Sequence, residues 1–195
     1  CALPIWVASS AMSTLPKVVD AAWLAAHHGE PDLQIADVRG PNAHGRGHIP
    51  GSLPLVLGSP PPSTDEEQLL ELAEEVALRL RRQGVSGDQR LVLYDDGGCV
   101  GATAAQTMAE LAGHPNVAVL LGGIGAWGGE LATGAVYPPK VREDLTPDVK
   151  AIATRAEIVA RLADDSLTLI DVRRPEEFSG KAGAACDPQI GRAHV

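Results

Sequence analysis

The sequence predicts an α/β fold, with a mostly parallel central sheet and helices on both faces. Segments with helical periodicity alternate with short apolar segments typical of strands, as in parallel sheets whose strands are joined by crossover helices. An internal repeat is the second observation: Asp37-Val38-Arg39 recurs as Asp171-Val172-Arg173, 134 residues later, and the preceding helix and strand recur at the same offset. A period this long indicates duplicated domains rather than a solenoid.

The first copy begins with a helix and two strands. Residues 18–28 have helical spacing and end at a glycine, and residues 33–37 form a short apolar strand. A loop rich in Gly, His and Pro follows. Residues 53–57 predict a second strand, and Pro54 within it favours an edge position because proline has no N–H for a ladder hydrogen bond.

A long helix follows. Thr64 and Glu67 have the spacing of a capping box, in which the two side chains each bond a backbone N–H at the start of a helix. Apolar residues then recur at helical spacing, at Leu69, Leu72, Val76 and Leu80. The remaining predicted elements of the first copy are a buried strand at 90–94, a loop at 95–101, a helix at 102–112, a strand at 117–121, and a Gly122-Gly123 turn before Trp127, which we expect in the core.

The second copy follows a segment rich in proline and charge. Thr154 and Glu157 form another capping box, which predicts a helix ending near Ala163, and residues 167–171 predict a strand. The expected organisation is a leader at 1–11, a first domain at 12–135, a linker at 136–153, the start of a second domain at 154–189, and a tail at 190–195.

The leader and the tail are predicted to be non-native. Residues 2–5 and residues 190–192 can be encoded by opposite strands of one sequencing-library adapter. On this hypothesis Met12 is the natural start, and Cys1 and His194 carry no functional information.

Composition excludes several classes of function. The net charge of −9 argues against binding to nucleic acid or to an anionic membrane, since nothing offsets phosphate repulsion. No apolar run reaches the roughly 18 residues that span a bilayer, and we expect a cytoplasmic protein. The 3 cysteines show neither a disulfide framework nor the spacing of a metal site.

The motifs together resemble the rhodanese family of sulfurtransferases. The first copy carries Asp37-Val38-Arg39 and then Gly-His-Ile-Pro-Gly at 47–51. An apolar strand ending in Tyr94, a glycine-rich loop and the segment 121–127, Leu-Gly-Gly-Ile-Gly-Ala-Trp, complete the pattern. The second copy matches from Asp171 to Phe178.

The resemblance implies a rhodanese fold and a cysteine that carries sulfane sulfur as a persulfide. The donor would be thiosulfate or 3-mercaptopyruvate and the acceptor a thiol or cyanide, with no cofactor and no metal. The family places this cysteine directly after the strand, in a loop whose N–H groups converge on an anion. Here Asp95 or Asp96 takes that position, depending on a one-residue gap, and the rest of the anion-binding loop is Gly97, Gly98, Val100 and Gly101.

Cys99 lies in the same loop, and two interpretations of it remain open. It is either a displaced nucleophile at a helix N-terminus or a small buried hydrophobic residue. The resemblance places the catalytic cysteine in the second domain, about 134 residues beyond Asp95. Cys186 comes too early in that domain to be this nucleophile.

The remaining motif residues are expected to be structural. Asp37 and Arg39 form an ion pair or hold the following loop, in preference to contacting substrate. Asp171 and Arg173 are their counterparts in the second copy, and His48 belongs to the scaffold by resemblance.

Two functions therefore stand: a sulfurtransferase that is active through its second domain, or a non-catalytic rhodanese-like binding module. A phosphatase of the same fold is excluded because no Arg or Lys follows Tyr94 before Met108 to hold phosphate. A dinucleotide site is excluded because the loop glycines lack the required spacing.

Overall fold

A computed structural model describes residues 14–58, 66–141 and 145–181. The predicted leader and tail, the Thr64 cap and Cys186 lie outside these residues. Contacts divide the chain into two compact units, Cys1–Arg155 and Ala156–Val195, which we describe separately.

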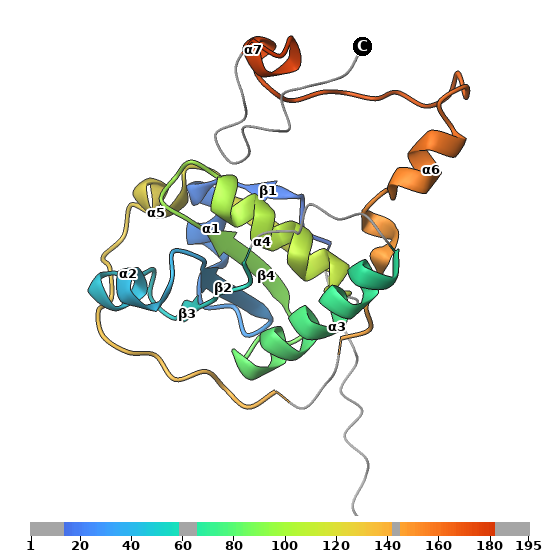
Figure 1. Ribbon diagram of the computed structural model, residues 1–195. Helices are drawn as coiled ribbons and strands as arrows, with labels where there is room; N and C mark the ends of the chain where they lie inside the picture. Colours follow the sequence, from blue (N-terminus) through green and yellow to red (C-terminus); the bar gives the residue numbers. More distant parts are fainter. Residues whose placement is uncertain (1–13, 59–65, 142–144, 182–195) are drawn as a thin grey trace, which may run out of the picture. The chain divides into compact units, whose positions relative to one another are not determined.

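The first unit is built on a five-stranded parallel sheet with the order β1-β5-β4-β2-β3 (Figure 1). The strands are β1 (Val18–Val19), β2 (Leu33–Asp37), β3 (Leu53–Pro54), β4 (Arg90–Tyr94) and β5 (Val117–Leu120). The edge position predicted from Pro54 is confirmed, because β3 ends the strand order and, among the described residues, pairs with β2 alone. All the pairings are parallel, so every strand ends at the same edge of the sheet.

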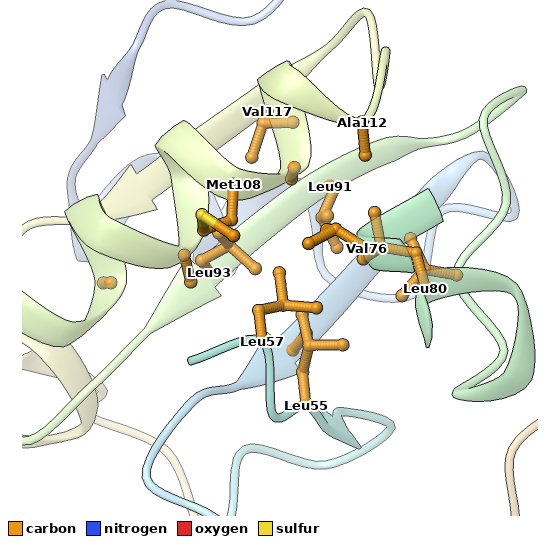
Figure 2. Close-up of a cluster of buried hydrophobic side chains, with 14 of the residues drawn as sticks. Leu55, Leu57, Val76, Leu80, Leu91, Leu93, Met108, Ala112 and Val117 are labelled. Carbon is orange, nitrogen blue, oxygen red and sulfur yellow. The ribbon is translucent and has the colours of Figure 1, made fainter. Parts of the chain in front are cut away.

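Helices cover both faces of the sheet, as predicted. Side chains alternate along β4: Leu91 and Leu93 join one buried cluster, and Val92 and Tyr94 join the other. The first cluster packs against α3 (Glu66–Arg82) and α4 (Val100–Leu111), as Figure 2 shows. The second packs against α1 (Ala21–His27) and α5 (Gly123–Ala126), where Trp127 is partly buried.

The N-terminal helix begins later than the sequence predicted. Val18 and Val19 form β1 and pair with β5, and α1 starts after Asp20. The Asp20 side chain accepts a hydrogen bond from the backbone N–H of Trp23 at 2.7 Å, which fixes Asp20 as the N-cap. The Asp20 cap therefore sets the start of α1, and the two valines before it pair with β5 instead.

Three other elements also differ from the sequence prediction. The predicted loop after β2 contains a short helix, α2 (Pro41–Arg46), with proline in its first turn, where the missing N–H costs no hydrogen bond. The strand predicted at 53–57 is only two residues long, although the Leu55 N–H still bonds the Asp37 carbonyl at 2.9 Å. Helix α4 begins two residues before its predicted start at Ala102.

The second unit contains α7 (Pro175–Phe178) and most of α6 (Arg155–Ala160). The strand predicted at 167–171 is wrong, since these residues are not in a strand and are mostly exposed. A strand needs a neighbour to bond, and the described part of this unit supplies none.

Part of the segment expected to be a linker belongs to the first unit and packs against its core and α4. Leu145 joins the first hydrophobic cluster, and the Asp148 N–H bonds the Leu111 carbonyl at the end of α4, at 3.0 Å. A short 3₁₀ helix, η1 (Val149–Ala151), follows. A Cβ at Gly113 would lie 1.7 Å from the Thr146 carbonyl oxygen, so this backbone approach requires glycine. Within the described residues, no helix is long and apolar enough to cross a membrane.

Gly113→Ala tests this packing. The new methyl group collides with the backbone of Thr146, and we expect a loss of about 2–4 kcal/mol in the free energy of unfolding, from overpacking and positive-φ strain together. Gly29→Ala is the matched control, because Gly29 has φ +89° against +87° at Gly113 but has open space around it. Urea denaturation of both variants measures the difference. Equal losses would contradict the packing of this segment.

Candidate anion-binding loop

The loop between β4 and α4 lies at the carboxyl end of the sheet's central strand, where parallel α/β sheets hold their functional loops. Asp95 follows β4 directly, and Cys99 is the N-cap of α4. The first N–H groups of α4 have no partner within the helix and carry its positive dipole end. An anion placed in this loop is therefore stabilised.

The Asp95 carboxylate occupies that position. Its Oδ1 accepts hydrogen bonds from the N–H groups of Gly97 at 2.8 Å and Cys99 at 3.2 Å. Its Oδ2 accepts one from the Ala102 N–H at 3.2 Å. The residue is only 8% exposed, so these bonds replace its contact with water. The N–H groups enclose the carboxylate as an anion nest.

The turn at the start of α5 packs against the backbone of the nest. The Ile124 N–H donates to the Asp95 carbonyl at 2.9 Å. A Cβ at Gly123 would lie 2.3 Å from that carbonyl oxygen and 2.5 Å from the Gly97 nitrogen. Gly97 itself has φ +112°, which only glycine adopts readily. The Gly122-Gly123 pair therefore lets two loops touch backbone to backbone.

The other predicted loop residues lie outside the nest. Asp96 is 85% exposed and faces the Arg39 guanidinium, with 3.8 Å between its Oδ1 and Nη1. Gly98 and Val100 are exposed. Gly101 lies on the first turn of α4, where a Cβ would be 3.6 Å from Asp95 Oδ2. Of the two aspartates, Asp95 is the one enclosed by the loop.

Cys99 lies beside the nest, and its side chain does not enter it. Its backbone has φ +60°, a left-handed conformation that costs a non-glycine residue about 1 kcal/mol. The thiol points at the Gly97 carbonyl oxygen, 3.9 Å away, and the side chain packs against the first hydrophobic cluster. The backbone N–H of Cys99 donates to Asp95 and is part of the nest, whereas its sulfur packs against the hydrophobic core.

Asp37 and Arg39 form a buried ion pair near the loop. Arg39 Nε donates to Asp37 Oδ1 at 2.9 Å, and Nη2 donates to Oδ2 at 2.6 Å. Nη2 also donates to the Gly47 carbonyl at 2.7 Å. Arg39 therefore bonds both Asp37 and the backbone of Gly47, at the end of the loop that contains α2.

A polar network continues from this pair under α2. The Tyr94 hydroxyl donates to Asp37 at 3.1 Å, accepts from the Ile49 N–H at 3.1 Å and meets the Ser52 hydroxyl at 3.0 Å. Burial raises the pKa of Tyr94 to about 12, so its hydroxyl keeps the proton that it donates.

Two stacked histidines complete the network. The rings of His44 and His48 are 3.7 Å apart, and both residues are buried. His44 Nε2 donates to the Ser52 carbonyl and His48 Nδ1 to the His44 carbonyl, each at 2.9 Å. Burial lowers the pKa of His44, which favours the neutral ring needed for close stacking. His48 is therefore a buried residue held by a hydrogen bond to the backbone of α2.

The second unit repeats the geometry of the Asp37–Arg39 pair. Arg173 Nε lies 3.0 Å from Asp171 Oδ1, and its Nη2 lies 2.6 Å from Oδ2. The short helix that follows begins with proline in both units, at Pro41 in α2 and at Pro175 in α7. The pair is more exposed here, at 34% for Arg173 and 31% for Asp171.

Sequence reasoning missed Tyr94, Ser52 and His44 as parts of one network. Its members lie far apart in the chain, and only the parallel pairing of β2 with β4 and β3 brings them together. Pro41 was the one local signal of α2. The described residues contain no cluster of acidic, histidine and cysteine side chains that could hold a metal ion.

Known proteins match both the sequence and the fold. The family model for the Rhodanese-like domain matches residues 20–130. The chain is 27% identical to 3-mercaptopyruvate sulfurtransferase of Escherichia coli, over 91% of this chain and 68% of the relative. It is 31% identical to a probable 3-mercaptopyruvate sulfurtransferase of Pseudomonas aeruginosa, over 90% of this chain and 67% of the relative.

A thiosulfate sulfurtransferase of Corynebacterium glutamicum is 29% identical, over 84% of this chain and 56% of its own length. The chain thus spans between about half and two thirds of these relatives. The crystal structure of SseA from Escherichia coli, described as a 3-mercaptopyruvate sulfotransferase, superimposes with a TM-score of 0.68 at 26% identity, covering 86% of this chain and 68% of that one.

The parallel sheet, the loop at the end of β4 and the matched residues together place this chain in the family of rhodanese-like domains, among the relatives of the sulfurtransferases.

Proposed function

We propose that this chain is part of a sulfurtransferase in which the domain around residues 20–130 does not itself carry sulfur. The observation behind this proposal is the Asp95 carboxylate, which accepts three backbone N–H bonds at the position where the family resemblance places a nucleophilic cysteine. A carboxylate fills the nest as a permanent anion. It has no sulfur atom with which to form a persulfide.

For the whole protein we propose the reaction for which its relatives are named, with thiosulfate or 3-mercaptopyruvate as the donor. A cysteine thiolate would attack the outer sulfur of thiosulfate or the thiol sulfur of 3-mercaptopyruvate. The S–S or C–S bond of the donor would break, and sulfite or the enolate of pyruvate would leave. The enolate would take up the proton of the donor's thiol and become pyruvate. The resulting persulfide would pass its sulfur to a thiol or to cyanide. The repeated Asp171–Arg173 geometry supports a second domain as the place for that cysteine.

The competing interpretation makes Cys99 the nucleophile. Its partly buried thiol, directed at a carbonyl oxygen and away from the N–H groups, argues against this role. If the whole protein performs no sulfur transfer, the remaining alternative is a binding module with the same fold.

The first prediction concerns activity and loop chemistry together. The 195-residue chain should form negligible thiocyanate from thiosulfate and cyanide, and Cys99→Ser should leave that rate unchanged. Asp95→Cys should place a thiol in the nest, where the N–H groups stabilise thiolate. Its alkylation by iodoacetamide should reach half its maximal rate well below pH 8.5, the region typical of a free cysteine.

Asp96→Cys is the matched control for that experiment, because Asp96 is exposed and outside the nest. Mass spectrometry of the loop peptide distinguishes the introduced thiol from Cys99. Thiocyanate formation at the rate of an active sulfurtransferase, abolished by Cys99→Ser, would overturn the proposal. So would identical alkylation profiles for the two introduced thiols.

The second prediction concerns stability. Asp95→Asn keeps the size of the side chain but replaces one acceptor oxygen with an NH₂ group that faces backbone N–H donors. We expect a loss of about 1–3 kcal/mol in the free energy of unfolding, the cost of leaving a buried donor unpaired. Asp96→Asn should change it by no more than about 0.5 kcal/mol, as expected at an exposed position. Urea denaturation at pH 7 measures both, and equal effects would rule out the nest.

A further inference from the structure

Next to the filled nest lies a separate cleft, of about 570 Å³, at the carboxyl edge of the sheet. Its volume is within the range of small-molecule sites, roughly 300–1,000 Å³. Its lining includes three charged side chains, Arg39, Arg46 and Asp96, and three apolar ones, Ala43, Ile124 and Leu131. Asp95 is not part of this lining.

We propose that this cleft binds a small organic anion, a carboxylate or sulfonate on a short apolar chain, between Arg39 and Arg46. The proposal goes beyond the function proposed above, because it requires no sulfur transfer by this domain or by any other.

Arg39 supplies a fixed cation at the cleft. Asp37 holds its Nε and Nη2, and the Gly47 carbonyl also accepts from Nη2. The side chain is only 11% exposed, so little side-chain entropy remains to be lost on binding. Its Nη1 is the nitrogen that faces Asp96, and it is available to an anion from the cleft.

The Asp96 carboxylate occupies the position beside Arg39 Nη1 where the anion would bind. Its carboxylate is 3.8 Å from Arg39 Nη1 and 85% exposed, and an ion pair of this kind is worth little in water. Arg46 is exposed and forms no ion pair with another described residue. When a ligand displaces Asp96, one weak ion pair is lost, and the ligand gains contacts with both Arg39 and Arg46.

The apolar residues select the rest of the ligand. Ala43 belongs to α2 and Ile124 to α5, and Leu131 follows α5 and is 47% exposed. A short hydrocarbon chain would pack against these side chains, whereas an inorganic anion has no apolar part that could do so. A ligand with an anionic end and a few methylene groups therefore fits better than sulfate does.

Isothermal titration calorimetry with propane-1-sulfonate tests the site. This probe has no sulfane sulfur, so failure of the proposed sulfurtransferase would leave its binding intact. We expect binding in the millimolar range that weakens as salt is added, because exposed charges are screened. Arg46→Gln should weaken binding about threefold or more. Asp96→Asn should tighten it by a similar factor, since it removes the competing carboxylate.

Arg82→Gln is the matched control, because Arg82 is an exposed arginine on α3 outside the cleft, and its affinity should equal that of the unmodified chain. Sulfate titrated under the same conditions should bind more weakly than propane-1-sulfonate. The proposal fails if propane-1-sulfonate does not bind even to the Asp96→Asn variant. It also fails if Arg46→Gln and Arg82→Gln weaken binding equally, which would indicate a nonspecific charge effect.

Discussion

The three hydrogen bonds from backbone N–H groups to the Asp95 carboxylate are the interaction on which the loop between β4 and α4 depends. They require a sharp loop after β4, which Gly97 permits by adopting a positive φ. They also require that the loop backbone pack directly against Gly123, where a side chain would collide with it. They also supply partners for N–H groups that α4 cannot satisfy internally. In the function proposed above, a sulfur-carrying thiolate would use the same kind of donors, so one loop geometry suits either a reactive anion or a permanent one.

Beside the nest, the two buried charges of Asp37 and Arg39 form an ion pair. Asp37 accepts from Nε and Nη2 of Arg39, and the Tyr94 hydroxyl links that pair to Ser52. A buried charge without a partner would cost several kcal/mol, and this network leaves Asp37 and Arg39 bonded on several sides. The bonds that hold Nε and Nη2 of Arg39 also fix its Nη1 at the adjacent cleft.

Much of this arrangement could be predicted from the sequence, because it is encoded locally. The strands β2 and β4 are short apolar runs, which predicted the α/β sheet. The resemblance to the rhodanese family then placed Asp95 or Asp96 in the anion-binding loop after Tyr94. The sequence could not decide between Asp95 and Asp96, since only the folded loop shows which carboxylate faces the N–H groups. The Tyr94–Ser52–His44 network and the cleft depend on contacts between distant segments, and no local pattern signals them. The strand predicted at 167–171 failed for the same reason, because strands form only where a partner exists.

The most direct measurement is amide hydrogen exchange by NMR at Gly97 and Cys99, the two loop residues whose N–H groups bond Asp95 Oδ1. If the nest exists, both amides exchange slowly in the unmodified chain and faster in Asp95→Asn, while Asp96→Asn leaves them protected. Exchange at the rate of an open loop in the unmodified chain, or equal rates in the two variants, would contradict a domain whose anion site is filled by its own carboxylate.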